Sequence, residues 1–199
     1  MTVFYQIFFL IFTYFLAAIP FGLLLTKVFA KKDIREFGSK NIGATNVTRI
    51  AGKKLGFATL ILDGMKGAVM VVIARFTFPD INNLHLFLVL VAATAVLAHI
   101  YPVYIGFKGG KGVATAIAVL IAIDPTVGFL VICCWLLSFL IFRISAAASM
   151  ISIFSSIILS FVYGVSNTQI VFCFFLFILI LIRHKENIAD MLTKKEKKN

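Results

Sequence analysis

Long apolar stretches limit what this chain can fold into more than any other feature. A helix needs about 20 mostly apolar residues to cross a bilayer, and six stretches approach or exceed that length: 3–26, 55–78, 85–105, 126–142, 145–163 and 168–182. Hydrophobic residues make up 61% of the chain, against about 45–50% in soluble domains. A water-soluble fold could not bury this much apolar surface, so we predict an all-α integral membrane protein.

A seventh apolar segment, 113–123, is too short to span the hydrocarbon fully and ends at Asp124-Pro125, a helix stop signal. This segment decides the topology. Seventeen of the 19 lysines and arginines lie in four segments: 27–54, 106–112, 142–145 and the residues from 183 onward. If the chain crosses the membrane seven times, all four basic segments lie on one side. If it crosses six times, they cannot.

Because basic loops stay in the cytoplasm, we predict seven transmembrane segments, one of them short, with the N-terminus outside and the C-terminus cytoplasmic. Residues 1–192 then form a single transmembrane domain, and 193–199 form a basic cytoplasmic tail. The first apolar run follows no basic residue and is too long for a signal peptide, so we expect it to be a retained span.

The excess of basic residues indicates which classes of partner this chain can bind. The formal net charge is +11, which indicates contact with membrane lipids or with anionic substrates. Nucleic acid is not expected as a partner, since the basic residues flank apolar spans. The three cysteines lie inside apolar stretches without metal-ligand spacing, so we expect packed side chains and no metal site.

A first polar motif, GSKNIGATNVTR, occupies residues 38–49. Its small residues let the backbone fold around a ligand, and Arg49 can hold a phosphate with two hydrogen bonds. The side chains able to donate to an anion are Ser39, Asn41, Thr45 and Asn46. The alternative is an ordinary polar loop with Asn and Gly turns.

A second motif, FKGGKGVAT, occupies residues 107–115 and leads into the short apolar segment. Glycines allow amide groups to point at an anion, and a following helix start adds partial positive charge. Lysines would neutralise the rest. The pattern predicts phosphate binding by Lys108, Gly109, Gly110, Lys111 and Gly112, although a flexible turn with interfacial lysines is the alternative.

A third motif, RHKENI at 183–188, follows the last span. On a helix, His184 and Asn187 share a face, and a histidine beside cations can bind phosphate or transfer a proton. A plain basic cluster that stops translocation is the alternative.

Two further groups lie within or beside the spans. Asp63 and Lys66 are three residues apart inside one span, and we predict a structural ion pair there rather than a catalytic one. The motif RISAAAS at 143–149 places Ser145 and Ser149 at a helix start, where they could bind substrate or simply permit close helix packing. His85 and His99 are expected to be packed or interfacial.

Together with DGMKG at 63–67, these motifs resemble the acyl-phosphate-dependent glycerol 3-phosphate acyltransferase family of bacterial membranes, in order and over nearly the whole chain. The resemblance implies transfer of a fatty acyl group from a long-chain acyl phosphate to the 1-hydroxyl of glycerol 3-phosphate. The products would be lysophosphatidic acid and phosphate, with no cofactor. It also implies a multi-pass protein of the bacterial cytoplasmic (inner) membrane, with its active site on the cytoplasmic face.

The resemblance carries roles over to individual residues. It implies catalytic roles for Ser39, Arg49, Lys111, His184 and Asn187. Substrate or phosphate binding falls to the remaining motif residues: Asn41, Thr45, Asn46, Lys108, Gly109, Gly110, Gly112, Ser145 and Ser149. Two positions depart from the family pattern, since Lys40 stands where glycine is usual and Asp190 stands where a basic residue is usual.

Two rival functions are less well supported by the residues. Acyltransferases that use acyl-CoA or acyl carrier protein resemble one another by an H-x-x-x-x-D motif, and no histidine here has an aspartate five residues later. A phosphate-ester transporter would need polar groups along a path open to both sides, but few charges lie near the outer face.

Overall fold

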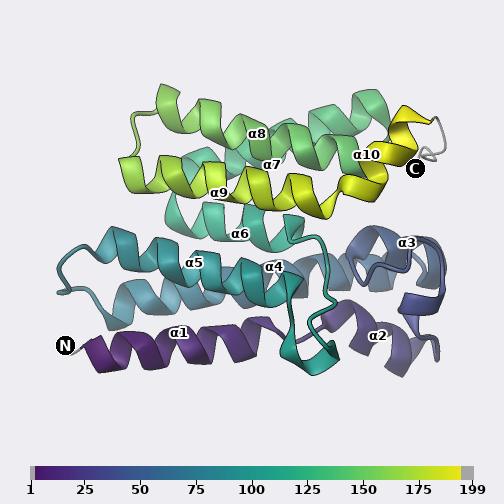
Figure 1. Cartoon of the computed structure of the whole chain (residues 1–199), viewed down its shortest axis with the longest axis horizontal. Helices are drawn as coiled ribbons and strands as arrows, with labels where there is room; N and C mark the ends of the chain where they lie inside the picture. Colours follow the sequence, from purple (N-terminus) through teal and green to yellow (C-terminus); the bar gives the residue numbers. More distant parts are fainter. Residues whose placement is uncertain (1–2, 194–199) are drawn as a thin grey trace.

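The computed structural model describes residues 3–193, and all regular structure in that range is helical. The all-α prediction is therefore confirmed. The elements, in chain order, are α1 Val3–Ala17, α2 Phe21–Phe29, the 3₁₀ turn η1 Ile34–Glu36, α3 Ala44–Ala51, α4 Lys53–Thr77, α5 Leu84–Ile100, the 3₁₀ turn η2 Val103–Ile105, α6 Val113–Ile123, α7 Pro125–Phe142, α8 Ser145–Val162, α9 Asn167–Arg183 and α10 Lys185–Leu192. The long helices lie side by side in one bundle (Figure 1).

The long apolar helices match the predicted spans closely. By length and composition, five helical segments of the described chain can cross a membrane, and a sixth is added if α9 and α10 count together despite a 61° bend. The short helix α6 has the predicted bounds, 113–123. Helix α5 ends at Ile100, before the predicted 105, because Pro102 disfavours helical geometry at the residue that precedes it.

The first predicted span, 3–26, is interrupted. Helix α1 ends at Ala17 and α2 begins at Phe21, with Pro20 between them. A proline lacks the N–H that a continuing helix needs, so carbonyl groups near the break lose their helical partners. Lys66 replaces one of them, since its Nζ donates to the Ile19 carbonyl at 2.8 Å.

Asp124 both ends α6 and begins α7. Its backbone N–H closes the last turn of α6, and its side chain accepts a hydrogen bond from Val127 N at 3.0 Å. Pro125 follows at the first position of α7, where its fixed φ suits a helix start. Arg75 donates to the carbonyls of Ala122 and Ile123, both at 2.9 Å. The predicted stop signal is thus also a start signal.

Small side chains allow close packing in the centre of the bundle. A Cβ added to Gly67 of α4 would lie 2.8 Å from the Thr115 side chain of α6, and alanines line the buried face of α5. Large apolar side chains such as Phe76 and Ile141 point outward and are more than 70% exposed. This inversion of the soluble pattern suits an integral membrane protein, whose surface meets lipid.

Candidate active site

The three polar motifs meet at one end of the bundle, which we call the loop end: residues 30–52, 106–112, 143–145 and 184–192. Helices α2, α3 and α10 lie toward this end, and the α5–α6 loop points the same way (Figure 1). Side-chain contacts join the segments across long sequence separations. Thr45 and Ser145 hydroxyls lie 3.1 Å apart, and Lys111 Nζ donates to Asn187 Oδ1.

Asn46 organises the first motif from inside. Its side chain is 2% exposed, and its Oδ1 accepts the Ser39 N–H at 3.1 Å. Its Nδ2 donates to the carbonyls of Phe37 at 3.0 Å and Asn41 at 2.9 Å, with a longer contact of 3.4 Å to Ile34. Asn46 thus holds the loop in shape, and its polar atoms are directed at the protein backbone.

Other parts of this loop also serve its shape. Asn41 Oδ1 accepts the Gly43 N–H at 2.8 Å. A Cβ on Gly22 of α2 would lie 1.9 Å from the Ile42 carbonyl, so the loop backbone rests directly on α2. Lys40 adopts a left-handed φ of +58°, a conformation that glycine tolerates best. A glycine would suit this backbone geometry better, so a lysine is an unusual residue at position 40.

Ser39, Thr45 and Arg49 of the first motif are exposed, as are Lys40 and Thr48. Arg49 lies in the last turn of α3, one helical turn beyond Thr45. These three side chains therefore border the space beside the loop, unlike the buried Asn46.

The glycine-rich loop is built against the end of α5. Gly109 N–H donates to the Ile100 carbonyl at 3.0 Å, and Gly110 N–H donates to the His99 carbonyl at 3.2 Å. A Cβ on Gly109 would lie 2.1 Å from the His99 carbonyl oxygen. The expectation that these two amides face a phosphate does not match this geometry, because protein carbonyls already accept their hydrogen atoms.

Gly112 and Lys111 occupy the transition into α6. Gly112 has a φ of +87° and precedes the first helical residue, so the loop turns sharply into the helix. The first amides of a helix have no partner within it, and they carry the positive end of its dipole. Lys111 is half-buried beside these amides, whereas Lys108 is exposed.

The third motif closes over the glycine-rich loop. Besides the Lys111–Asn187 contact, the Arg183 guanidinium lies 3.4 and 3.3 Å from the carbonyls of Gly109 and Gly110. His184, between α9 and α10, is 2% exposed and its Nδ1 lies 2.8 Å from the Ile180 carbonyl. Burial, with the nearby Lys111 charge, lowers the pKa of His184 to about 4, so the imidazole is neutral at pH 7.

Ser145 and Ser149 differ in their surroundings. Ser145 faces Thr45 across the loop end. Ser149 is buried, donates to the Ser145 carbonyl at 2.8 Å and accepts the Trp135 Nε1–H at 3.1 Å. The polar atoms of Ser149 are thus engaged between α7 and α8, which gives this residue a packing role in the structure.

Asp63 and Lys66 form an ion pair below the loop end, with Lys66 Nζ 3.0 Å from Asp63 Oδ1 and both side chains 3% exposed. The imidazole of His99 joins them, its Nδ1 lying 3.6 Å from the same carboxylate oxygen. The sequence alone predicts that His99 is a packed or interfacial residue. Its proximity to Asp63 is a contact between two helices, which local sequence patterns do not reveal.

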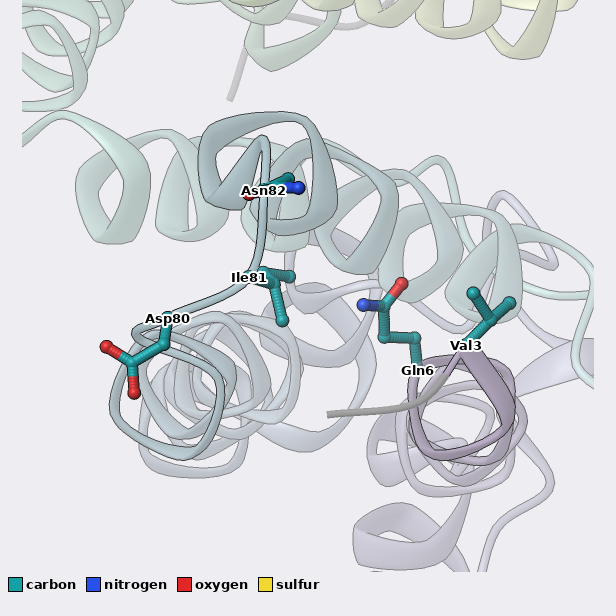
Figure 2. A pocket seen from close by; sticks show the side chains of 5 residues that line it. All are labelled: Val3, Gln6, Asp80, Ile81 and Asn82. Atoms are coloured by element: carbon teal, nitrogen blue, oxygen red, sulfur yellow. The ribbon is translucent and has the colours of Figure 1, made fainter.

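A pocket at the opposite end of the bundle contains none of the predicted site residues. It has a volume of about 370 Å³ and is lined by Val3, Gln6, Asp80, Ile81 and Asn82. Figure 2 shows the Gln6 amide pointing toward Ile81, whereas the Asp80 carboxylate points away from the other side chains. The residues of the three motifs therefore lie at the loop end and not in this pocket.

The chain is similar to known glycerol-3-phosphate acyltransferases. The family model described as glycerol-3-phosphate acyltransferase matches residues 7–194. The glycerol-3-phosphate acyltransferase of Pelagibacter ubique (strain HTCC1062) is 39% identical over 186 residues, covering 94% of this chain and 93% of the relative. That of Desulfotalea psychrophila (strain LSv54 / DSM 12343) is 42% identical over 187 residues, covering 93% of each.

The fold also matches solved structures. The crystal structure of PlsY (YgiH), an integral membrane glycerol 3-phosphate acyltransferase in its glycerol 3-phosphate form, superposes with a TM-score of 0.91 at 39% identity, covering 98% of this chain and 95% of that one. Its lysophosphatidic acid form gives a TM-score of 0.87 at 38% identity, covering 97% and 94%. The resemblance drawn from the motifs is thus confirmed, and the chain belongs to the glycerol-3-phosphate acyltransferase family.

Proposed function

We propose that this protein transfers a fatty acyl group from a long-chain acyl phosphate to the 1-hydroxyl of glycerol 3-phosphate, giving lysophosphatidic acid and inorganic phosphate for phospholipid synthesis. The observation that carries the proposal is the convergence of the cationic motifs at the loop end. Lys111 contacts the third motif and Arg183 contacts the glycine-rich loop, and the first motif contacts the start of α8 at the same end through Thr45 and Ser145. Two phosphate-bearing substrates need such a concentration of positive charge.

The proposed mechanism is direct attack of the hydroxyl on the acyl carbonyl. A mixed anhydride is already activated, so the protein has to hold two anions in attack geometry and offset their repulsion. Arg49 and Lys111, with the first amides of α6, would bind phosphate groups. Ser39 and Asn187 would orient substrate beside them, and Lys108 would add charge from the exposed side of the loop.

The proton of the attacking hydroxyl needs an acceptor. His184 is neutral at pH 7, but a pKa lowered to about 4 makes it a weak base. A substrate phosphate, whose second pKa is about 6, is the stronger acceptor. We therefore assign proton acceptance to the substrate and a supporting role to His184, which packs beneath the start of α10.

The proposed location is the bacterial cytoplasmic (inner) membrane, with the active site on the cytoplasmic face. Contacts among residues 45, 111, 145 and 187 support seven crossings. Because these residues share the loop end, each intervening segment must run away and return, which makes α4–α5, α6–α7 and α8–α9 pairs. The first span adds one more, and the basic segments then lie inside with the C-terminus.

The donor distinguishes this function from its rivals. Purified protein should acylate glycerol 3-phosphate with palmitoyl phosphate, release inorganic phosphate, and remain inactive with palmitoyl-CoA. A transporter would release no phosphate from palmitoyl phosphate. Equal rates with palmitoyl-CoA, after exclusion of contaminating enzymes, would reject the assignment of the donor.

The topology has its own test. In a cysteine-free variant, a single cysteine placed in the tail 193–199 should be shielded from membrane-impermeant reagents in intact cells. Labelling of that cysteine from outside would reject the proposed orientation.

A further inference from the structure

His99 lies between a buried ion pair and the glycine-rich loop. On one side its Nδ1 is 3.6 Å from Asp63 Oδ1. On the other side, a Cβ added to Gly110 would lie 2.1 Å from His99 Nε2, and the next two atoms it would meet, at 2.8 and 3.1 Å, also belong to this ring. The imidazole therefore fills the space beneath Gly110 that any other residue's side chain would occupy.

The ion pair borders the ring on the side away from Gly110. Asp63 and Lys66 are almost fully buried, and a buried charge pair keeps its geometry only where further polar contacts satisfy it. Lys66 also donates to the Ile19 carbonyl at the α1–α2 break, and the Asp63 carbonyl accepts the Thr115 hydroxyl of α6 at 2.7 Å. The α1–α2 break and α6 are thus tied to the turn of α4 that carries Asp63 and Lys66.

A backbone hydrogen bond also connects residue 99 to the glycine-rich loop. The His99 carbonyl accepts the Gly110 N–H, so residue 99 supports Gly110 with its backbone and with its ring. Gly110 directly precedes Lys111, whose ammonium group contacts Asn187. A shift of the ring would move the loop and, with it, the cation that the proposed function places on a substrate phosphate.

We propose that His99 is a positioning residue, which is held by Asp63 and supports Gly110 so that Lys111 and the first amides of α6 face the phosphate of the substrate. This inference rests on the proposed function only in taking the bound group to be a phosphate ester. His99 touches no reacting atom in this role. It acts through the loop.

The test is a compensating pair of substitutions. His99→Ala should lower kcat/KM for glycerol 3-phosphate by about 10- to 100-fold, since displacements near 1 Å have such effects. Gly110→Ala should lower it by at least about 100-fold, because its methyl group collides with the imidazole. The double variant should be at least about tenfold more active than Gly110→Ala, since removal of the ring makes room for the methyl group.

Two matched controls separate positioning from general damage. Gly109→Ala would collide with backbone carbonyls of α5, so His99→Ala should not rescue it. His85→Ala, at the other end of the same helix, should leave kcat/KM within about twofold. A double variant no more active than Gly110→Ala, or equal rescue of Gly109→Ala, would overturn the proposal.

The role of His99 can still be tested if His99→Ala does not fold or if the wild-type protein shows no acyl transfer. If His99→Ala is not recovered folded from membranes, His99→Asn is smaller than histidine, keeps an amide toward Asp63 and replaces it in the same comparison. If wild-type protein shows no transfer from palmitoyl phosphate, the proposed function fails. Calorimetric binding of glycerol 3-phosphate to the same variants then decides the role of His99, with rescue of affinity expected for the same pair.

Discussion

The first motif loop, residues 34–46, is held together by hydrogen bonds from one side chain. The glycine-rich loop, residues 106–112, is held by close backbone packing that is possible only because its glycines have no side chains. Asn46 reaches into the first loop and bonds to its backbone at several points. Gly109 and Gly110 instead let the second loop lie directly on the end of α5. The first loop should therefore be sensitive to losing atoms and the second to gaining them.

The largest expected effect removes the one lysine of the second loop that contacts another motif. Lys111→Ala should lower kcat by about 10²- to 10³-fold, the cost of losing one donor aimed at developing charge, while the protein stays folded. Lys108→Ala, in the exposed part of the same loop, should cost only a few-fold. Initial rates at saturating substrate measure both, and near-normal turnover of Lys111→Ala would remove this residue from the site.

Adding one methyl group tests how tightly the second loop is packed. Gly109→Ala should lower kcat/KM by about 100-fold, since its Cβ would lie 2.1 Å from a backbone carbonyl that cannot rotate away. Gly106→Ala is the control, because nothing lies within 4 Å of its Cβ position and only its φ of +64° is unfavourable. Similar losses in the two variants would contradict the packing argument.

Deleting the side chain of Asn46 tests the first loop. Asn46→Ala should destabilise the loop by about 2–3 kcal/mol, since the lost hydrogen bonds contribute about 1 kcal/mol each. Asn46→Asp should be no better, because a carboxylate keeps the acceptor for Ser39 N–H but turns an oxygen toward the carbonyls of Phe37 and Asn41. Hydrogen exchange at the Ser39 amide reports on both variants, and unchanged protection would refute this role.

Replacing Lys40 should have a smaller effect, and it should stabilise the loop instead of destabilising it. Lys40 holds a left-handed φ of +58°, which costs a non-glycine residue about 1 kcal/mol. Lys40→Gly should therefore raise the stability of the loop by up to about 1 kcal/mol, less the extra chain entropy of glycine. Lys40→Ala is the control that removes the charge without relieving the backbone, and thermal unfolding in detergent compares the two.

The smallest expected effect concerns an exposed ion cluster beside the first loop. The Arg35 guanidinium donates two hydrogen bonds to the Asp33 carboxylate, and Lys27 Nζ lies 3.2 Å from it, so the pKa of Asp33 is held well below its ordinary value. The stabilisation is present above about pH 4 and is lost as the pH falls toward the folded pKa. Asp33→Asn should cost about 0.5 kcal/mol at pH 7, and less at high salt. A larger cost that persists in high salt would disagree.

The helices could be predicted well because a bilayer imposes simple rules of length and polarity. The bounds of α6 follow from its apolar run and from Asp124-Pro125. The break between α1 and α2 was harder, because the apolar run continues through it and only Pro20 indicates it. Lys66 completes the break from another helix, and such a contact is not visible in local sequence.

The sequence predicted that the basic motifs share one side of the bundle, but it did not predict where their polar groups point. The motifs identified Asn46, Gly109 and Gly110 as special, yet polar and glycine residues serve a loop's internal structure as readily as they serve a ligand. The direction of each group depends on neighbours far along the chain, such as the α5 carbonyls. The contact of His99 with Asp63 could not be predicted for the same reason, since the two residues lie on different helices.

The brevity of α6 has a consequence for how the chain enters a membrane. Eleven residues extend about 16 Å at 1.5 Å per residue, roughly half of a hydrocarbon core about 30 Å thick. Such a segment is a poor independent substrate for insertion, because its ends would leave backbone groups unpaired in lipid. Arg75 of α4 supplies hydrogen bonds to one of those ends. We therefore expect α6 to enter the bilayer together with its neighbours, so that the orientation of every later helix depends on an assembly step and not on hydropathy alone.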